Sequence, residues 1–404
     1  MRTSLLTVLL AGALVAAFSP AAGADAEPAR DYIVVLQDGA DSPSVANEHA
    51  RDKGAVPGRV YRHALRGYSA KMTPAAARAI AQDSRVRWVQ PDGVVSISAQ
   101  TLPTGIDRVD ADASPTARID GSDQRVNVDV AVIDTGVDLD HPDLNVHTAG
   151  AVNCSSGRSA DDGNGHGTHV AGTIGALDNA DGVVGVAPGA RIWPVRVLNN
   201  RGSGSWSDVI CGIDYVTAHA SEIEVANMSL GGLGADDGNC GNTNNDAMHK
   251  AICASVAAGV TYAVAAGNES DNAANHVPAA YDEVITVSAL ADFNGLPGGG
   301  AAATCRSDVD DTFAGFSNFG ADVDLIAPGV CILSTWKGGG YNTISGTSMA
   351  TPHVAGGAAL YKATHAGASP ATVKSALQTA GTTDWNAADD PDGTKERLLN
   401  VATF

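Results

Sequence analysis

The sequence predicts an α/β protein with a doubly wound, mostly parallel sheet, preceded by a small α+β domain. Strand-like apolar segments alternate with helix-like segments from residue 126 onward, whereas residues 27–98 follow a different order. Glycine and alanine are abundant and aromatic residues are scarce, at 5% of the chain. Alternation of this kind is typical of parallel sheets that helices cover on both faces.

The first residues, 1–24, have the features of a secretory signal peptide. Arg2 precedes the apolar run 5–18, and Ala22-Gly23-Ala24 has the A-x-A spacing that places cleavage before Asp25. The run is too short for a membrane-spanning helix, and no later stretch is long and apolar enough to be one. We therefore expect a secreted, extracellular protein with no membrane partner.

Residues 27–98 are predicted to form a ferredoxin-like unit with the order β-α-β-β-α-β. Its expected elements are a strand in 31–41, a helix over 44–55, two strands within 58–72, and a helix followed by a strand within 73–92. Residues 93–105 should link this unit to the rest of the chain.

The larger unit, residues 99–404, should contain the parallel sheet. Strands are expected at 126–136, 191–198, 225–230, 260–268 and 284–290, and helices at 167–177, 207–220, 247–259 and within 343–360. Ligand sites in such sheets lie beyond the carboxyl ends of the strands, so side chains that follow these strands are the candidates for function.

Charge is unevenly spread along the chain. Residues 27–98 carry 10 Lys and Arg against 8 Asp and Glu, while residues 99–404 carry 14 against 36. An acidic surface of this kind makes a nucleic-acid partner improbable for the larger unit and favours solubility and the binding of cations.

Three motifs in the larger unit carry residues with catalytic potential. Asp134 ends the strand in "VAVIDTG", His166 stands at the Gly-rich start of a helix in "DDGNGHGTHVAG", and Ser348 begins another helix in "SGTSMATPH". Each residue alone is more often structural than catalytic: a capping serine, a buried histidine, a carboxylate in a turn. Together, each in a tight turn, they specify a Ser/His/Asp set.

The alternative for the histidine motif is a metal site. His166 and His169 form an H-x-x-H pair, but the glutamate of the H-E-x-x-H zinc motif is missing. A zinc site is therefore not expected.

The chain order Asp, His, Ser and the length of the three motifs closely resemble the subtilases, the group of subtilisin and proteinase K. The resemblance covers the chain after the signal peptide and implies a subtilisin-like fold. It implies that Ser348 is the nucleophile, His166 the general base and Asp134 the residue that orients His166. It also makes Asn268, in "AVAAGN", a donor to the oxyanion, and leaves His353 a structural neighbour of the site.

The resemblance implies that a peptide substrate binds in an extended form between segments 202–206 and 229–232. Gly202, Gly204, Gly231 and Gly232 should leave room for its backbone, and Trp206 should form a wall of an apolar subsite. The substrate-binding residues so implied are Gly202, Ser203, Gly204, Trp206, Ser229, Leu230, Gly231, Ala265 and Gly267. The loop after Asn268 differs in length from that of familiar members, so the position of His276 near the pocket is open.

The same resemblance implies structural calcium, which prefers all-oxygen ligand sets. A strong site would use Gln100, Asp143, Leu177, Asn179, Asp181 and Val183. A second, weaker site would use Asp282, Val284 and Asp324. The alternative for both calcium sites is a polar loop that binds no metal.

The six cysteines of an exported chain should form disulfides. The sequence contains no C-x-x-C pair, so the cysteines are not expected to bind a metal. Six cysteines allow 15 connectivities. From proximity along the chain we expect Cys240–Cys253 and Cys305–Cys331, which leaves Cys154–Cys211.

The sequence thus predicts a secreted serine endopeptidase of broad specificity with an apolar preference. We expect it to be made with a propeptide, residues 27–98, that inhibits the enzyme until autocleavage at Ser98–Ala99. We expect the enzyme to act as a monomer. One alternative is a catalytically silent peptide-binding scaffold, but that reading needs a broken triad. The other is an esterase, against which the peptide-binding segments count.

Overall fold

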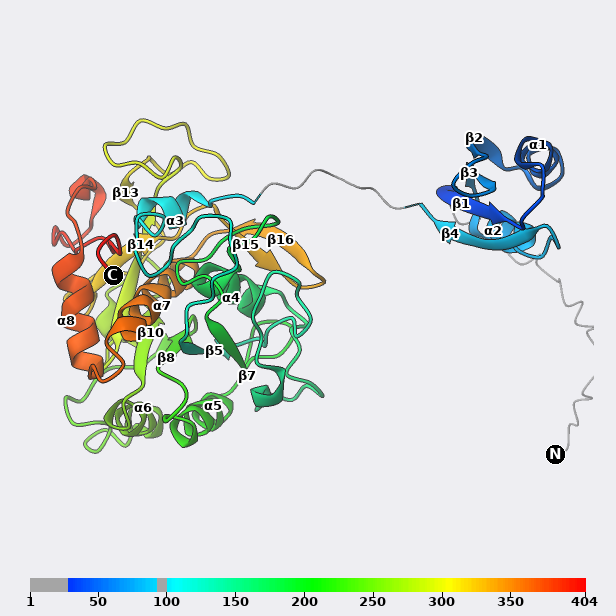
Figure 1. Ribbon diagram of the computed structural model, residues 1–404. Helices are drawn as coiled ribbons and strands as arrows, with labels where there is room; N and C mark the ends of the chain where they lie inside the picture. The colour runs from blue at the N-terminus through cyan, green and yellow to red at the C-terminus, as the bar shows by residue number, and fades with distance from the viewer. Residues whose placement is uncertain (1–27, 93–99) are drawn as a thin grey trace, which may run out of the picture. The chain divides into compact units, whose positions relative to one another are not determined.

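The computed structural model describes residues 28–92 and 100–404. The predicted signal peptide and the predicted cleavage site at Ser98–Ala99 lie outside these ranges. The chain divides into two compact units, Met1–Ile97 and Ser98–Phe404 (Figure 1).

The smaller unit has the predicted β-α-β-β-α-β order, with strands in the antiparallel order β2-β3-β1-β4. Its elements are β1 (Arg30–Leu36), α1 (Ser42–Lys53), β2 (Val56–Tyr61), β3 (Gly67–Met72), α2 (Pro74–Ile80) and β4 (Val86–Pro91). Helix α2 starts where the sequence dictates: the Thr73 hydroxyl accepts a bond from the N–H of Ala76, and Pro74 occupies the first turn. Val34, Tyr68 and Ile80 are fully buried in its core.

The larger unit is built on an eight-stranded sheet, and all of its strand pairs are parallel except β12 with β13. The strand order is β13-β12-β10-β8-β5-β7-β6, and β14 pairs with β12. The strands are β5 (Asp129–Asp134), β6 (Val152–Asn153), β7 (Arg191–Arg196), β8 (Val225–Met228), β10 (Thr261–Ala265), β12 (Ile285–Ala291), β13 (Thr312–Phe313) and β14 (Leu325–Pro328). Because β5 is flanked by β7 on one side and β8 on the other, the sheet is doubly wound, and this prediction is confirmed.

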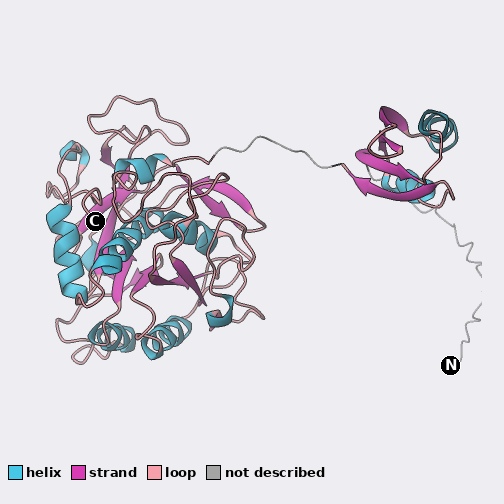
Figure 2. Cartoon of the chain, in the orientation of Figure 1, coloured by secondary structure: helices cyan, strands magenta, loops and turns pink. Residues whose placement is uncertain are grey.

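Helices cover both faces of this sheet (Figure 2). They are α4 (His166–Gly175), α5 (Trp206–Ala218), α6 (Ala247–Ala257), α7 (Thr347–Thr364) and α8 (Pro370–Ala380). Strand β5 divides its side chains between the two layers. Val130 and Val132 pack in the core that contains α4, α7 and α8, while Ala131 and Ile133 pack in the core that contains α5 and α6. Both faces are apolar, which explains the near-continuous Val/Ile run in the sequence.

Several elements were not predicted from the sequence. They are the helices α3 (Thr104–Arg108) and α8, the strands β6, β13 and β14 of the large sheet, the two-residue strands β9 (Gly232–Leu233) and β11 (His276–Val277), and the hairpin β15 (Ile332–Trp336) with β16 (Gly340–Ile344). Helix α3 begins at the end of the expected linker, 93–105, and continues three residues beyond it. None of the helices in the described ranges combines the length and the apolar character needed to cross a membrane.

All three expected disulfides are present: Cys154–Cys211, Cys240–Cys253 and Cys305–Cys331. The first joins the segment that follows β6 to helix α5, and the second closes a loop onto helix α6. These cross-links restrict the unfolded chain and so stabilise the folded unit.

Candidate active site

The predicted catalytic residues meet at one edge of the large sheet. Asp134 is the last residue of β5, Ser229 directly follows β8, and Asn268 follows β10. Ser348 is the second residue of helix α7, which packs against these strands. Parallel strands end at the same edge, so the fold brings residues far apart in the sequence together there.

Asp134 and His166 form a hydrogen-bonded pair. The side chain of Asp134 is fully buried, and its Oδ1 atom lies 2.8 Å from Nδ1 of His166. The same oxygen accepts a bond of 2.7 Å from the N–H of Thr135. His166 is the first residue of α4, and Gly165 before it adopts φ +113°, where a Cβ atom would collide with the Trp336 ring. Only glycine fits at that turn.

The pair shifts the protonation of the imidazole. Burial alone would lower the pKa of His166, but the charge of Asp134 and its hydrogen bond more than offset burial, so the pKa is raised above its usual value. The imidazole keeps 25% of its surface exposed, toward the cleft.

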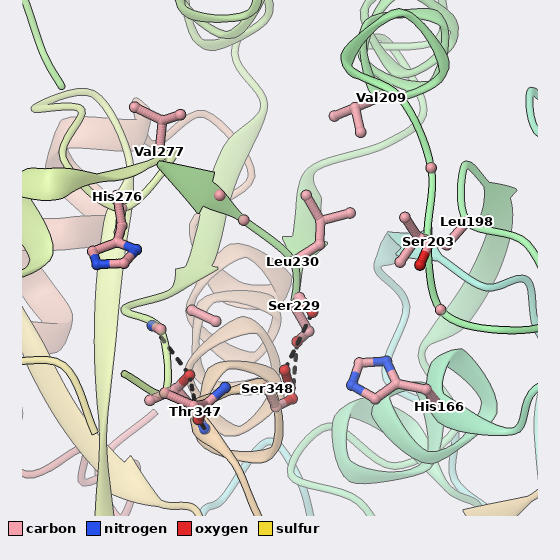
Figure 3. Close-up of a pocket in the computed structure, with 18 of the residues that line it drawn as sticks. His166, Leu198, Ser203, Val209, Ser229, Leu230, His276, Val277, Thr347 and Ser348 are labelled. Atoms are coloured by element: carbon pink, nitrogen blue, oxygen red, sulfur yellow. Dashed lines mark hydrogen bonds between the residues drawn. The ribbon is translucent and has the colours of Figure 1, made fainter. Parts of the chain in front are cut away.

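Ser348 lies across the cleft from His166 (Figure 3). Its hydroxyl donates to the carbonyl of Ser229 at 3.2 Å, and the hydroxyl of Ser229 donates to the carbonyl of Ser348 at 2.8 Å. These two bonds hold the start of α7 against the end of β8.

Asn268 is held by the residue that precedes Ser348. Its Oδ1 atom accepts bonds from the N–H of Thr347 at 2.8 Å and from the Thr347 hydroxyl at 3.1 Å. The Thr347 hydroxyl also accepts a bond from the N–H of Gly267. With its oxygen engaged in this way, the amide group of Asn268 presents its NH₂ as the remaining donor. No sequence signal indicated this role of Thr347.

His169 in α4 and His353 in α7 are structural. His169 Nε2 donates to the carbonyl of Ile332 at 2.9 Å, and burial lowers the pKa of His169 to about 3. His353 Nδ1 donates to the carbonyl of Met349, and burial lowers its pKa to about 4. Both rings are therefore neutral near pH 7, in line with the structural role expected for His353.

A cleft of about 870 Å³ joins these residues. Its lining includes His166, Asn268 and Ser348 and all nine predicted substrate-binding residues: Gly202, Ser203, Gly204, Trp206, Ser229, Leu230, Gly231, Ala265 and Gly267. His276 also lines the cleft, and its Nε2 atom lies 3.1 Å from Oδ2 of Asp271. Sequence reasoning missed Asn164 and Glu269, which also face the cleft.

The glycines of the cleft are needed for different physical reasons. Gly202 adopts φ +75° with open space around it, as expected of a surface that a backbone approaches. At Gly204 a Cβ atom would collide with the carbonyl of Val197, and at Gly232 it would press on the Trp206 ring. These two glycines are required by packing inside the protein itself.

The six residues of the expected strong calcium site are drawn together by hydrogen bonds. Asp143 accepts from the side chain of Asn179 at 2.9 Å and from the N–H of Val183 at 3.0 Å. The Gln100 amide donates to the carbonyl of Leu177 at 3.0 Å. The N–H of Asp181 donates to Oδ1 of Asn179 at 2.7 Å.

The three residues expected at the weaker site also converge, but on an ammonium group. Lys374 Nζ donates to the carbonyls of Val284 and Asp282 at 2.8 and 3.3 Å, and it forms an ion pair of 2.8 Å with Asp324. The expectation of a metal ion there is corrected: the ammonium group of Lys374, from α8, lies where the cation was expected, and no motif in the sequence indicated it.

Comparison with known proteins agrees with this geometry. Residues 126–397 match the Subtilase family, and residues 31–98 match Peptidase inhibitor I9. Subtilisin NAT of Bacillus subtilis subsp. natto is 35% identical over 394 residues, which cover 95% of each chain. A subtilisin of Bacillus pumilus is 40% identical over 287 residues, 70% of this chain and 93% of its own.

A solved structure shares the fold as well. The crystal structure of a cold adapted subtilisin-like serine proteinase superposes with a TM-score of 0.54 at 34% identity, covering 74% of this chain and 98% of that one. Neither the silent scaffold nor the esterase alternative is favoured by these relatives. The chain belongs to the subtilase family and is a serine endopeptidase with an inhibitor-type propeptide domain.

Proposed function

We propose that this endopeptidase cleaves peptide bonds through an acyl-enzyme formed on Ser348. The observation that supports this proposal is the buried Asp134–His166 pair, which faces Ser348 within one cleft. A serine hydroxyl is a weak nucleophile until a neighbouring base accepts its proton, and His166 is the base within that cleft.

The steps follow from these positions. The Ser348 oxygen attacks the peptide carbonyl carbon while its proton passes to Nε2 of His166. The imidazolium then gives that proton to the leaving amine as the C–N bond breaks, and the Ser348 ester remains. Water, activated by the neutral imidazole, hydrolyses the ester. Asp134 stays ionised throughout, fixes the tautomer of His166 and stabilises the imidazolium.

The carbonyl oxygen becomes negative in the tetrahedral intermediate and needs donors. The NH₂ group of Asn268 and the N–H of Ser348 at the start of α7 supply them. Because Thr347 already holds the amide oxygen of Asn268, the donor is oriented before substrate arrives, and no reorganisation accompanies the reaction.

Substrate is proposed to bind as an extended strand between segments 202–204 and 229–231. Trp206 is 43% exposed beside Gly232 and offers an apolar wall. We therefore propose broad specificity with a preference for apolar residues, both before the scissile bond and three positions upstream of that residue.

A structural calcium ion is proposed at the strong site, where it would hold the loop 177–183 and supply no catalytic chemistry. Asp143 is 2% exposed, and no lysine or arginine pairs with it in the described part of the chain. Burial raises the pKa of Asp143, and the hydrogen bonds from Val183, Asn179 and Tyr341 offset this effect only in part. Members of this family generally bind calcium of this structural kind, and the oxygen-only set fits it.

The remaining expectations concern processing and location. We propose a signal peptide at 1–24, secretion, a propeptide at 27–98 and a mature peptidase from residue 99. The I9 match at residues 31–98 supports inhibition of the enzyme by its own propeptide. We also propose that the active form is a monomer.

Covalent labelling tests the catalytic assignment directly. A fluorophosphonate should add to Ser348 in the folded enzyme, and the labelled peptide is identified by mass spectrometry. His166→Ala should abolish labelling because the base is lost, while Ser375→Ala, an exposed serine on α8, should leave it unchanged. Labelling of another serine, or labelling that survives His166→Ala, would overturn the assignment.

A further inference from the structure

A group of three carboxylates lies near the C-terminus, outside the cleft and the strong calcium site. Asp390, Asp392 and Glu396 each place one carboxylate oxygen within 4.8 Å of the others. They belong to the loop "DPDGTKE", which follows α8 and a short 3-10 helix at Ala387–Asp389.

Two of these side chains are buried and have unpaired oxygens, although Oδ1 of Asp390 accepts a bond of 3.3 Å from the N–H of Asp392. Asp390 and Glu396 are 7% and 6% exposed. Oδ2 of Asp390 and both carboxylate oxygens of Glu396 are fully buried and make no hydrogen bond in the described structure. Buried polar groups are nearly always paired, so three orphaned oxygens at one place call for a missing partner.

The neighbouring cations are engaged elsewhere. Lys395 lies over the ring of Trp385, with Nζ 5.6 Å from its centre, and Arg397 donates to the carbonyl of Gly381. No ion pair within residues 28–92 and 100–404 involves any of the three carboxylates.

Close carboxylates repel one another unless a proton or a cation lies between them. Burial, reinforced by the negative charge of the neighbours, raises the pKa of Glu396 to about 8 and that of Asp390 to about 6. Without a cation, the cluster would therefore hold protons at neutral pH.

We propose that Asp390, Asp392 and Glu396 bind a calcium ion at a site separate from the loop 177–183. The donors are oxygen atoms only, which disfavours zinc, whose structural sites use nitrogen and sulfur. Magnesium keeps most of its water shell and is usually bound by one or two carboxylates, whereas calcium accepts several protein oxygens in irregular geometry.

The ion would secure the end of the chain. The carbonyl of Glu396 accepts a bond of 3.0 Å from Nε1 of the buried Trp385. Directly after it, Arg397 and Leu399 bond to the backbone of Ile326 in β14. A cation on Glu396 would thus fix the C-terminal segment against the edge of the large sheet. This inference does not depend on the catalytic assignment.

Terbium luminescence tests the site because Trp385 lies next to Glu396. The mature enzyme, inactivated with phenylmethylsulfonyl fluoride, is titrated with Tb³⁺ and excited at the tryptophan band. We expect sensitised emission that calcium displaces and that Glu396→Gln largely removes. Asp143→Asn should leave that part of the emission in place, and Asp389→Asn, an exposed acid at the end of the preceding 3-10 helix, should leave the titration unchanged.

Thermal unfolding gives a second readout with a change of sign. In EDTA at about pH 9, above the raised pKa of Glu396, Glu396→Gln should raise the melting temperature, because it removes a repelling buried charge. In millimolar calcium the same variant should melt below the wild type, because a ligand bound only by the folded state no longer stabilises it. If Glu396→Gln fails to fold, Asp392→Asn, at an exposed position, replaces it in both measurements.

The alternative is a proton shared between Asp390 and Glu396. In that case Glu396→Gln would shift the melting temperature equally in EDTA and in calcium, and the terbium emission would match that of the wild type. Either result would overturn the calcium proposal.

Discussion

At the scale of single residues, Asn268 is the clearest case of a side chain oriented before the reaction. Thr347 holds its oxygen, so Asn268→Ala removes the donor without touching His166 or Ser348. Subtilisin is the reference case for this loss, and on that basis kcat should fall about 10²- to 10³-fold with little change in KM. Steady-state kinetics on a peptide substrate measure it, with Asn244→Ala, exposed and remote, as the control. A fall in kcat of less than tenfold would contradict the oxyanion role.

Asp134 governs the pH dependence. The pKa of His166 is raised above its ordinary value of 6.5, so kcat/KM of the wild type should drop as the pH falls through that raised value. In Asp134→Asn the attracting charge is lost and burial, which lowers the pKa, prevails. The acidic limb of the profile should therefore move to lower pH, and kcat should fall about 10⁴-fold as the tautomer is lost.

The control for this profile is Asp161→Asn, which removes one exposed charge near the site without contact to the imidazole. Its acidic limb should coincide with that of the wild type. An unmoved limb in Asp134→Asn would show that another group sets the profile.

Much of the site was predictable at this scale because the chemistry is written in short motifs. Asp134, His166 and Ser348 each stand in a distinctive turn, and the cleft collects them together with Asn268. The roles of Thr347 and Lys374 were not predictable. Each acts through hydrogen bonds to residues about 80 to 90 positions away, and such pairs appear only once the fold is known.

At the scale of elements, the loop 177–183 carries the proposed strong calcium site. Removing calcium should speed autolysis and lower the melting temperature, since the loop and the Gln100 segment would lose their common ligand. Asp143→Asn should bring the melting temperature in calcium down and remove most of the calcium effect. Asp389→Asn serves as the matched control. Equal inactivation rates in EDTA and in millimolar calcium, for the wild type, would rule this site out.

The elements themselves were predictable where periodicity was strong. The buried strands β5 and β10 and the helices α4 to α7 lie close to their expected positions because long apolar patterns specify them. The hairpin β15–β16 was missed because its second strand alternates between half-buried and exposed positions around the Gly338–Gly340 turn. Pairing with a neighbouring strand, not local preference, determines such a segment.

At the scale of the whole molecule, the two units differ in charge and in role. Residues 27–98 are slightly basic and residues 99–404 strongly acidic, which favours association of the free propeptide with the peptidase. Ser348→Ala, expressed in a protease-deficient host, should retain the propeptide because the enzyme cannot cut its own chain. Intact mass and N-terminal sequencing decide this, and Ser375→Ala should be processed normally.

In the wild type we expect the mature chain to start within two residues of Ala99, and the released fragment should inhibit the enzyme in trans until it is degraded. A start near Asp25 in the active enzyme would refute processing. A start well beyond Pro103 would remove Gln100 from the proposed calcium loop.

Lys374 gives this molecule a built-in counterion. The ammonium group is covalently attached to the chain, so a chelator cannot remove it and dilution cannot release it. Its ion pair with Asp324 and its hydrogen bonds to the two carbonyls therefore do not require an ion from the medium. The segment around Asp282 should therefore resist calcium depletion even while the loop 177–183 responds to it. Lys374→Met would remove this charge and leave Asp324 and the two carbonyls without their partner. Unfolding of that variant should become sensitive to added sodium, potassium or calcium in a way that the wild-type segment is not, and hydrogen exchange of residues 282–286 would report the difference.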